Sequence, residues 1–432
     1  MSGLLRLCTA GHVDDGKSTL IGRLLHDARG VYEDQVRAVE AASQSRGAGP
    51  IDFSLFTDGL RAEREQGITI DVAYRYFATA RRTFILADTP GHEQYTRNMA
   101  TGASRADLAV LLVDARHGLR EQTLRHARIA RLLGISSFVL AINKMDLVGF
   151  EAGVFDRIAE AFRPVVAGAA LRAIPVSALH GDNVIARSAR TPWYSGPSLL
   201  EYLETVDAGI DVNQASFRFP VQLVLRTADF RGYAGQVTAG VVRRGDRITV
   251  WPSGRRAHVR RILTWDGDLD VAQAPLSVTL ELEEHLDVSR GDLIATGRPD
   301  VTQHFTADVV WMDERPLEPE RVYLLKHARR TVPVELDRAL SLNDIGTLTL
   351  TTAAPLALDR YVEHRGTGSF ILIDPSTCFT CGAGMIVAPL ATRDDRVERL
   401  TAAGRLAHAA RGASSDSEAV AVVQRALEEM LR

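Results

Sequence analysis

The chain has 432 residues, of which 46% are hydrophobic and 24% charged, and its 51 basic and 54 acidic residues give a formal net charge of -3. This balance predicts a folded protein with several hydrophobic cores and excludes a disordered chain. Because the charge is near neutral and no long basic stripe is present, no nucleic-acid partner is expected. No apolar run approaches the roughly 18 residues that a membrane span needs, so no membrane association is expected.

The first 206 residues alternate short apolar runs with longer segments of helical composition. The apolar runs are LLRLCTA, RTFILADT, LAVLLVDA, FVLAINK and LRAIPVSA. Strands that are nearly continuous in apolar residues are typical of a parallel sheet covered by helices on both faces. We therefore predict an α/β domain with a doubly wound, mostly parallel sheet over residues 1–206.

After a linker at 207–214, the sequence pattern of the chain changes. Short β-branched runs punctuated by Gly, Asp and Pro predict two small antiparallel β-barrels, over residues 215–300 and 301–390. Within them, Gly245-Asp246 and Gly291-Asp292 each precede an apolar run, as expected where a turn leads into a barrel strand. The remaining residues, 391–432, have helical spacing and predict a helical or mobile C-terminal tail.

The three cysteines, Cys8, Cys378 and Cys381, are too few for a disulfide framework and fit a reducing compartment. Because the start of the chain runs directly into a phosphate-loop pattern, without room for a signal peptide, a cytoplasmic location is expected. The Cys-x-x-Cys pair at 378–381 is typical of half a zinc site or of a redox pair, but no second ligand pair that would complete a zinc site follows it. We therefore expect two small buried residues at a strand or turn there.

A phosphate-binding loop is indicated at residues 11–18, GHVDDGKS, between an apolar run and the helical segment STLIGRLLHDA. Its glycines allow the backbone to curl so that N–H groups face an anion at a helix N-terminus. Lys17 is expected to reach the β- and γ-phosphates, and Ser18 to bind Mg²⁺. The nucleotide-binding residues predicted here are Gly11, His12, Val13, Asp14, Asp15, Gly16, Lys17, Ser18 and Thr19.

A second motif, DTPGH at residues 88–92, follows the apolar run RTFILA, which places Asp88 at the carboxyl end of a strand, beside the first loop. We expect Asp88 to hold Mg²⁺ through water, with Thr89 and Pro90 completing the loop. Gly91 can offer its N–H to the γ-phosphate because it has no side chain. His92 is then placed to orient the attacking water, although a surface or core histidine is the alternative.

Guanine is the base that the remaining motifs predict. They are Asn143-Lys144-Met145-Asp146 after FVLAI and Ser177-Ala178-Leu179 after LRAIPV. The Asp146 carboxylate can accept hydrogen bonds from N1–H and from the 2-amino group of guanine, which adenine cannot supply. With adenine those acceptors would stay unpaired, at about 1–3 kcal/mol each. The Ala178 N–H is expected to donate to the guanine oxygen.

A switch segment is predicted at residues 63–70, EREQGITI. The Thr69 hydroxyl can join Ser18 on Mg²⁺ only while a γ-phosphate is present, which couples the order of this loop to the nucleotide state. The predicted catalytic set is Lys17, Thr69, Gly91 and His92, and the predicted metal ligands are Ser18, Thr69 and, through water, Asp88.

These motifs, followed by two β-rich units, resemble the elongation factor Tu and 1A family over residues 1–390. More narrowly, the segments VDDGKSTLIGRLLHD, DGLRAEREQGITIDVAYRYF, DTPGHEQYTRNMATGAS, PWYSGPSLLEYLETV, DFRGYAG and DVVWM are similar to the GTPase subunits of bacterial sulfate adenylyltransferases. This resemblance implies GTP as substrate, Mg²⁺ as cofactor, and a heterodimer or higher assembly with a small catalytic subunit. That subunit would adenylate sulfate with ATP, and GTP hydrolysis would drive the formation of adenosine 5'-phosphosulfate.

Two alternatives share the nucleotide motifs: a translation elongation factor-like GTPase and a regulatory GTP-binding scaffold with negligible turnover. Some relatives carry a fused adenylylsulfate kinase, but the tail contains no second G-K-[ST] loop, so kinase activity is not expected.

Overall fold

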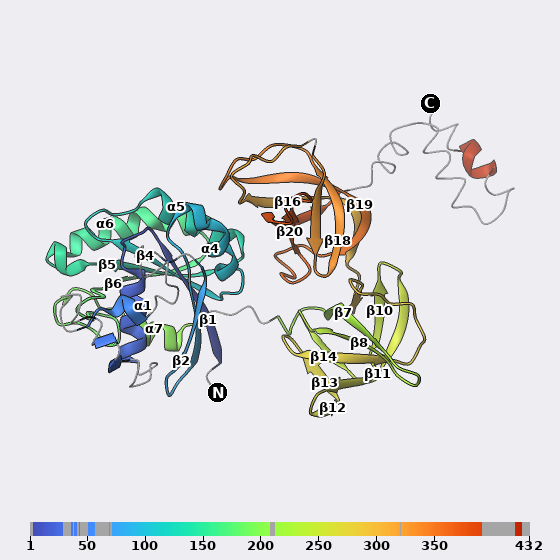
Figure 1. Cartoon of the computed structure of the whole chain (residues 1–432), viewed down its shortest axis with the longest axis horizontal. Coiled ribbons are helices and arrows are strands. Elements are labelled where there is room, and N and C mark those ends of the chain that lie inside the picture. Colours follow the sequence, from blue (N-terminus) through green and yellow to red (C-terminus); the bar gives the residue numbers. More distant parts are fainter. Residues whose placement is uncertain are drawn as a thin grey trace. The chain divides into compact units, whose positions relative to one another are not determined.

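The computed structural model describes residues 3–28, 36–37, 39–40, 43, 51–56, 69, 71–207, 212–319, 321–390 and 420–425. The chain divides into two compact units, Met1–Asp211 and Val212–Arg432 (Figure 1). In the described residues, no helix combines the length and the apolar character that crossing a membrane requires.

The first unit is built on a six-stranded sheet in the order β2-β3-β1-β4-β5-β6, in which β2 is antiparallel to β3 and the other neighbours are parallel. The central strands β4 and β5 are buried along their whole length, as their unbroken apolar runs predict. The strands are β1 (Leu4–Gly11), β2 (Ala73–Ala78), β3 (Thr83–Asp88), β4 (Leu108–Asp114), β5 (Ser137–Asn143) and β6 (Ala170–Pro175).

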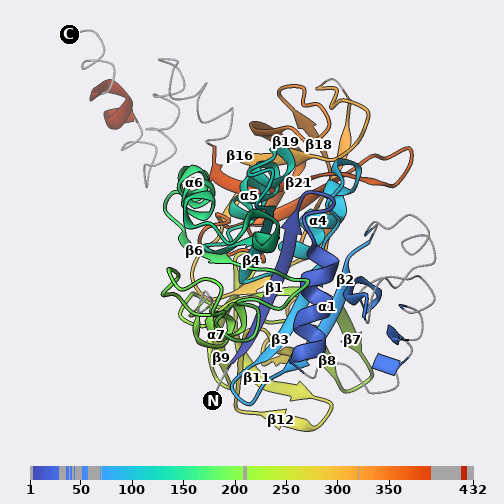
Figure 2. The same ribbon diagram turned by 90° about the vertical axis from the view of Figure 1, so that its left-hand side faces the viewer.

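Helices cover both faces of this sheet: α4, α5 and α6 lie on one side and α1 and α7 on the other (Figures 1 and 2). The doubly wound α/β arrangement is therefore confirmed. The helices are α1 (Lys17–Asp27), α4 (Thr96–Ala103), α5 (Glu121–Leu132), α6 (Ala152–Phe162) and α7 (Leu199–Thr205), and the short 3₁₀ helices are η1 (Phe53–Phe56), η2 (Glu93–Tyr95), η3 (Met145–Val148) and η4 (Arg163–Val166).

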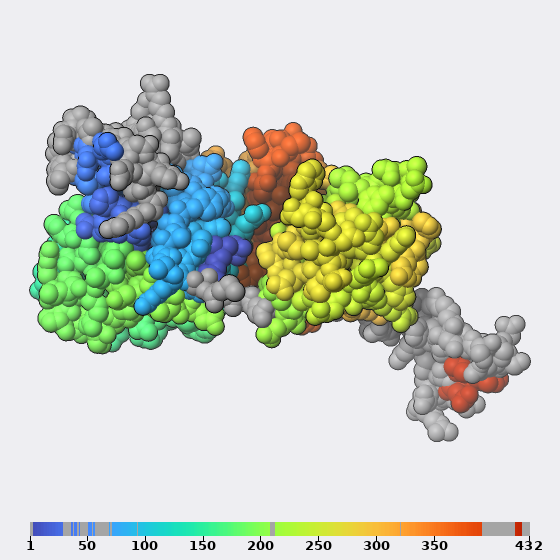
Figure 3. All heavy atoms as spheres, turned by 90° about the horizontal axis from the view of Figure 1, so that it is seen from below, coloured from blue at the N-terminus to red at the C-terminus, as the bar shows by residue number. Residues whose placement is uncertain are grey.

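Strand β2, which forms one edge of the sheet, was not predicted. Its residues are alternately more and less exposed, with Tyr76 66% exposed, because among the described strands β2 pairs with β3 alone and one of its faces meets solvent. The light-blue segment that contains it lies at the molecular surface in Figure 3. A search for continuous apolar runs does not detect such a strand.

The second unit begins with a closed antiparallel barrel, in which strands follow the order β10-β15-β7-β8-β14-β11-β12 and a pairing of β10 with β11 closes the ring. Gly245 and Gly291 have φ values of +86° and +95° in the turns before β10 and β15, as the Gly-Asp pairs predict. The strands of this sheet are β7 (Arg218–Arg226), β8 (Arg231–Gln236), β10 (Arg247–Trp251), β11 (Arg255–Thr264), β12 (Gly267–Leu269), β14 (Ser277–Leu282) and β15 (Leu293–Ala295), and β9 (Val241–Arg243) pairs with β13 (Val271–Gln273) in a separate two-stranded sheet.

A second closed antiparallel barrel follows, in the order β16-β19-β18-β17-β20-β21. Two antiparallel barrels after the α/β domain were predicted, and this fold class is confirmed. Of the predicted tail, residues 420–425 are helical and the others lie outside the described residues. The strands are β16 (Asp300–Trp311), β17 (Tyr323–His327), β18 (Arg330–Leu336), β19 (Ile345–Leu358), β20 (Ser369–Ile373) and β21 (Thr380–Pro389).

A buried ion pair joins the two barrels. Arg218, at the start of β7, donates from Nε and Nη2 to the two carboxylate oxygens of Asp359, both at 2.8 Å, and the two side chains are 4% and 5% exposed. The Thr367 hydroxyl also donates to Asp359, at 2.6 Å. Burial by itself would raise the pKa of Asp359, but the bonds from Arg218 and Thr367 outweigh it and lower that pKa below its ordinary value.

The cysteine pair differs from the prediction in one respect. Cys381 is buried in the second barrel, as expected, but Cys378 is exposed. Cys378 has φ +60° in the turn before β21, and this left-handed turn keeps its side chain at the surface.

Candidate nucleotide-binding site

The predicted phosphate loop connects β1 to α1, and its backbone takes conformations that few residues tolerate. Gly16, the N-cap of α1, has φ +91°, and Asp14 has φ +67°. A side chain at Gly16 would also place its Cβ 2.4 Å from Nδ2 of Asn143. The glycine before Lys17 is therefore required both by the backbone conformation and by the space around it.

The Lys17 ammonium group is held inside this loop. Its Nζ donates to the carbonyl oxygens of Gly11 at 3.2 Å and His12 at 2.9 Å, and the side chain is buried. Burial lowers the pKa of Lys17, while the neighbouring charges of Asp88 and Asp15 oppose this shift. A buried cation whose hydrogen bonds within the described residues go to neutral carbonyls is well suited to receive an anion.

His12 and Asp15 close the loop across Val13. The His12 N–H donates to a carboxylate oxygen of Asp15 at 2.9 Å, and the Asp15 N–H points back to the His12 carbonyl at 3.4 Å. Burial raises the pKa of Asp15, although the bond from His12 and the charge of Lys17 act in the other direction. Asp15 thus fixes the shape of the loop.

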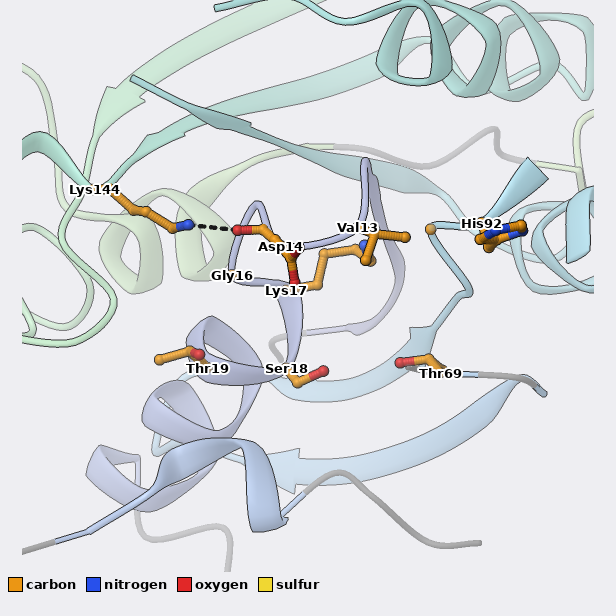
Figure 4. Close-up of a pocket in the computed structure, with 10 residues that line it drawn as sticks. Val13, Asp14, Gly16, Lys17, Ser18, Thr19, Thr69, His92 and Lys144 are labelled. Atoms are coloured by element: carbon orange, nitrogen blue, oxygen red, sulfur yellow. Dashed lines mark hydrogen bonds between the residues drawn. The ribbon is translucent and has the colours of Figure 1, made fainter. Parts of the chain in front are cut away.

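A hollow of about 300 Å³ opens beside the loop. In Figure 4 the hydroxyl groups of Ser18 and Thr69 point toward one another across it. The structure therefore brings together residues that are far apart in the sequence but were predicted to form one site. Those lining the hollow are Val13, Asp14, Gly16, Lys17, Ser18, Thr19, Thr69, Gly91, His92 and Lys144.

Of the predicted switch segment, only Thr69 belongs to the described residues, and 63–68 and Ile70 lie outside them. The prediction of a nucleotide-dependent loop there accordingly stays a prediction.

Asp88 ends β3 next to the phosphate loop, as its position after an apolar run predicts. It is buried and accepts a hydrogen bond from the Thr9 hydroxyl at 3.2 Å. The Thr89 hydroxyl donates to the Thr9 carbonyl at 2.5 Å, and Pro90 is buried. These contacts fix the start of the DTPGH motif against β1.

Gly91 packs directly on the phosphate loop. A Cβ at this position would lie 2.4 Å from Nζ of Lys17 and 2.9 Å from the carbonyl oxygen of Gly11. His92 follows, and its Nδ1 accepts a hydrogen bond from the Gln94 N–H at 3.3 Å. In the neutral imidazole this leaves the proton on Nε2, for which the described residues supply no partner.

The predicted base-recognition motif is bonded to the phosphate loop at two points. Asn143 donates from Nδ2 to the Asp15 carbonyl at 2.8 Å and accepts at Oδ1 from the Ala178 N–H at 2.9 Å. Lys144, in the left-handed conformation with φ +59°, donates to the Asp14 carbonyl at 2.5 Å. The dashed line in Figure 4 marks the second of these connections.

The other base-recognition residues gather next to Asn143. The Ser177 hydroxyl donates to Oδ1 of Asp146 at 2.6 Å, and His180 Nε2 lies 3.8 Å from the other carboxylate oxygen. Met145 is fully buried beneath them, whereas Leu179 is 58% exposed. Asp146 is thus oriented by Ser177, at the end of the loop that Asn143 and Lys144 connect to the phosphate loop.

Asp114, which sequence reasoning missed, stabilises this arrangement. It ends β4 and accepts from Lys144 Nζ at 2.9 Å and from Arg116 Nη2 at 2.6 Å. Burial by itself would raise the pKa of Asp114, but the bonds from both cations outweigh it and hold that pKa below its usual range. The available signal was the acidic residue directly after the run LAVLLV, the same pattern that identified Asp88.

His126 on α5 was also missed. It is fully buried, and its Nδ1 accepts a hydrogen bond from the Gly11 N–H at 3.3 Å. Burial lowers the pKa of His126 to about 3, so it is neutral at physiological pH. No sequence motif marks a histidine on the buried face of a helix as a support for a distant loop.

Comparison with known proteins agrees with this geometry. Residues 3–211 match the family model of the elongation factor Tu GTP-binding domain, and residues 335–387 match a GTP-eEF1A C-terminal domain-like model.

Among relatives, sulfate adenylyltransferase subunit 1 of Tolumonas auensis is 52% identical over 412 residues, covering 90% of this chain and 87% of the relative. The corresponding protein of Bacteroides fragilis is 50% identical over 92% of this chain and 87% of its own length. The bifunctional enzyme CysN/CysC of Mycobacterium tuberculosis is 51% identical, and the matched region spans 91% of this chain and 69% of that enzyme. The chain therefore belongs to the family of sulfate adenylyltransferase subunit 1 proteins, whose amino-terminal part here is a GTP-binding domain of the elongation factor Tu type.

Proposed function

We propose that this chain binds and hydrolyses GTP as the large subunit of a sulfate adenylyltransferase. In this function, GTP hydrolysis drives the ATP-dependent adenylation of sulfate to adenosine 5'-phosphosulfate in a smaller catalytic subunit. One observation carries the proposal: in a chain about 50% identical to subunit 1 proteins over 90% or more of its length, the phosphate loop is hydrogen-bonded to the base-recognition motif through Asn143 and Lys144.

The base-recognition residues support GTP as the nucleotide. Because the Ser177 hydroxyl occupies one lone pair of Asp146, the carboxylate is oriented and keeps other lone pairs that can accept from guanine N1–H and the 2-amino group. The Ala178 N–H already donates to Asn143, so the guanine oxygen would share this donor or exchange it. In this assignment Lys144 and Leu179 border the base.

The phosphates are assigned to the hollow around Lys17. In this assignment Lys17 exchanges its bonds to the loop carbonyls for bonds to β- and γ-phosphate oxygens. Gly91 lies against Lys17 and offers its N–H to the γ-phosphate. His92 orients the attacking water through Nε2, the ring nitrogen that its contact with Gln94 leaves unengaged.

The donor set fits Mg²⁺, because the groups gathered at this end of the hollow are oxygen ligands and Mg²⁺ prefers oxygen. Ser18 and Thr69 present facing hydroxyl groups, and the buried carboxylate of Asp88 ends the adjacent strand. Ser18 and Thr69 would hold the ion directly and Asp88 through water. The ion would neutralise charge that develops between the β- and γ-phosphates.

The relatives' name, subunit 1, implies a partner subunit. We assign that role to the small subunit that adenylates sulfate. The single phosphate loop in the sequence of this chain is connected to a motif that recognises guanine. We therefore assign ATP binding and the adenylation of sulfate to the partner.

Reconstitution with the small subunit tests the proposal. GDP and adenosine 5'-phosphosulfate are followed together, with ATP and sulfate present, for each subunit alone and for the pair. The pair should form both products, and adenosine 5'-phosphosulfate should stay low with a non-hydrolysable GTP analogue. GTP turnover without any effect on sulfate adenylation would favour the elongation factor-like alternative, and GTP binding without turnover would favour the regulatory scaffold.

A further inference from the structure

A second hollow, of about 470 Å³, adjoins the nucleotide site. The two hollows share Val13, Asp14, Gly91 and His92 in their walls, so they meet at the end of the site that the proposed function gives to the γ-phosphate. The outer wall of the second hollow comes from the first five residues of α5 and the residue before it, and it contributes two arginines.

The two arginines differ in their partners. Arg125 donates to the Glu121 carboxylate at 3.1 Å and to Oε1 of Gln122 at 3.0 Å, so its charge is already paired. For Arg120, no carboxylate of the described part of the chain lies within ion-pair distance. Its hydrogen-bond partner is the ring nitrogen Nδ1 of His12, at 2.9 Å.

His12 can exchange its hydrogen bond with Arg120 for one with the carbonyl of Val13. A guanidinium group can only donate, so Nδ1 of His12 must accept when it binds Arg120. The same Nδ1 lies 2.7 Å from the carbonyl oxygen of Val13, to which it can only donate. Because one nitrogen cannot do both, a change of imidazole tautomer releases Arg120 and bonds His12 to its own loop instead.

Arg120 also lies close to the buried end of the phosphate loop. The His12 carbonyl accepts from Lys17 Nζ at 2.9 Å, and the charge of Arg120 acts on the Asp15 carboxylate inside the loop. A guanidinium without an acidic partner, next to a site built for phosphates, would gain a strong, bidentate interaction when a phosphate arrives.

We propose that Arg120 is a catalytic residue for GTP hydrolysis, held on His12 until GTP binds and then donating to the γ-phosphate from within the same chain. This inference rests on the proposed GTPase function and deepens it. During the reaction, the water oxygen bonds to the γ-phosphorus, the bond to the β–γ bridging oxygen breaks and its electron pair stays on GDP. The protons of the water end on the released phosphate. Arg120 gains and loses no proton; its hydrogen bonds stabilise the negative charge of the transferred group.

Three variants of the full chain test this role: Arg120→Ala, Arg120→Lys and, as the matched control from the same hollow, Arg125→Ala. Single-turnover GTP hydrolysis is measured with and without the small subunit, ATP and sulfate, and GTP and GDP affinities are measured by titration. Arg120→Ala should lower the hydrolysis rate by at least about 10²-fold, should weaken GTP binding, and should leave GDP affinity unchanged.

Arg120→Lys should recover part of the rate, because it keeps the charge but not the forked donors. Arg125→Ala should keep the rate of the unmodified chain.

The proposal is overturned if Arg120→Ala hydrolyses GTP at the unmodified rate, or if it loses GTP and GDP affinity equally, since either result reduces Arg120 to a support of the loop. An equal loss of hydrolysis rate in Arg125→Ala would also overturn the proposal, because the rate would then depend on the overall positive charge of the hollow and not on Arg120 itself. If the unmodified chain does not hydrolyse GTP under any condition, the proposed function fails. The ratio of GTP to GDP affinity in Arg120→Ala then still decides whether Arg120 contacts the γ-phosphate.

Discussion

Removing the carboxylate that joins the two barrels should destabilise the second unit strongly. Asp359→Ala deletes both bonds from Arg218 and the bond from the Thr367 hydroxyl, and it leaves a guanidinium in an environment where its side chain is 4% exposed. Arg218 keeps its bonds to the carbonyls of Phe217 and Thr296, but its charge is then uncompensated. Breaking a buried pair in this way costs about 3–5 kcal/mol. For a folded unit of about 150–250 residues this corresponds to a fall in melting temperature of about 6–20 °C.

Denaturant unfolding of the full chain, followed by tryptophan fluorescence, measures this loss. A double-mutant cycle with Arg218→Ala gives the interaction energy between Arg218 and Asp359 separately from their other contacts. Because each single variant leaves one buried charge unpaired, the double variant should be less destabilised than the sum of the two. The control is Asp268→Ala, which removes an Arg261–Asp268 pair of similar forked geometry whose side chains are 41% and 51% exposed. That variant should unfold like the unmodified chain. Equal destabilisation by Asp359→Ala and Asp268→Ala would refute the argument from burial.

The pair of Arg218 and Asp359 also determines how the stability of the second unit changes with pH. The pKa of Asp359 is lowered in the folded chain, so the unfolded state binds this proton at higher pH than the folded state does. The contribution of Asp359 to stability is therefore complete above its unfolded pKa and is lost as the pH falls toward the lowered folded pKa. In Asp359→Ala this acid-induced part of the stability loss should be absent, as unfolding curves at a series of acidic pH values would show.

Three further predictions concern the nucleotide site. Asp146→Asn should weaken GTP binding and improve acceptance of xanthosine triphosphate, whose 2-oxo group requires a donor; an unchanged preference for GTP in competition titrations would contradict the base assignment. His92→Ala should keep GTP affinity and lose most of the turnover, whereas Lys17→Ala should lose both, so indistinguishable titration curves would reject this division of roles. Gly91→Ala should lower nucleotide affinity at least about tenfold, or about 1.4 kcal/mol, because its Cβ would lie 2.9 Å from the fixed carbonyl of Gly11; normal affinity would show that the loop can shift.

Much of the fold was predictable because its strongest signals are local. The strands β3, β4 and β5 are nearly continuous apolar runs, β1 and β6 are interrupted by one arginine each, and a parallel sheet covered on both faces favours such runs. The glycine-containing turns before β10 and β15 are equally local, since left-handed backbone there favours glycine. β2 was missed because it is a half-exposed edge strand, and the exposure of Cys378 was missed because it depends on one left-handed turn.

The residues of the candidate site also include some that the sequence predicts and others that it does not. Residues in contiguous motifs, such as Lys17 and Asn143, were found from the sequence because the chemistry of phosphate and base binding fixes their spacing. Asp114, His126 and Arg120 were not, because each acts through a contact across the fold, to Lys144, Gly11 and His12 respectively. Such contacts follow from how α5 and β4 pack beside the loop, and the order of residues along the chain does not encode them directly.

The hydrogen bonds from Asn143 and Lys144 to the phosphate loop also bear on how long GDP remains bound. Asn143 and Lys144, in the base-recognition loop, are hydrogen-bonded to the carbonyls of Asp15 and Asp14 in the phosphate loop. The contacts with the phosphates and the contacts with guanine should therefore break together. We therefore expect GDP release to require both loops to open together and to be slow in the isolated chain. An exchange factor would need to displace only one of the two loops, because the other would lose its anchoring with it.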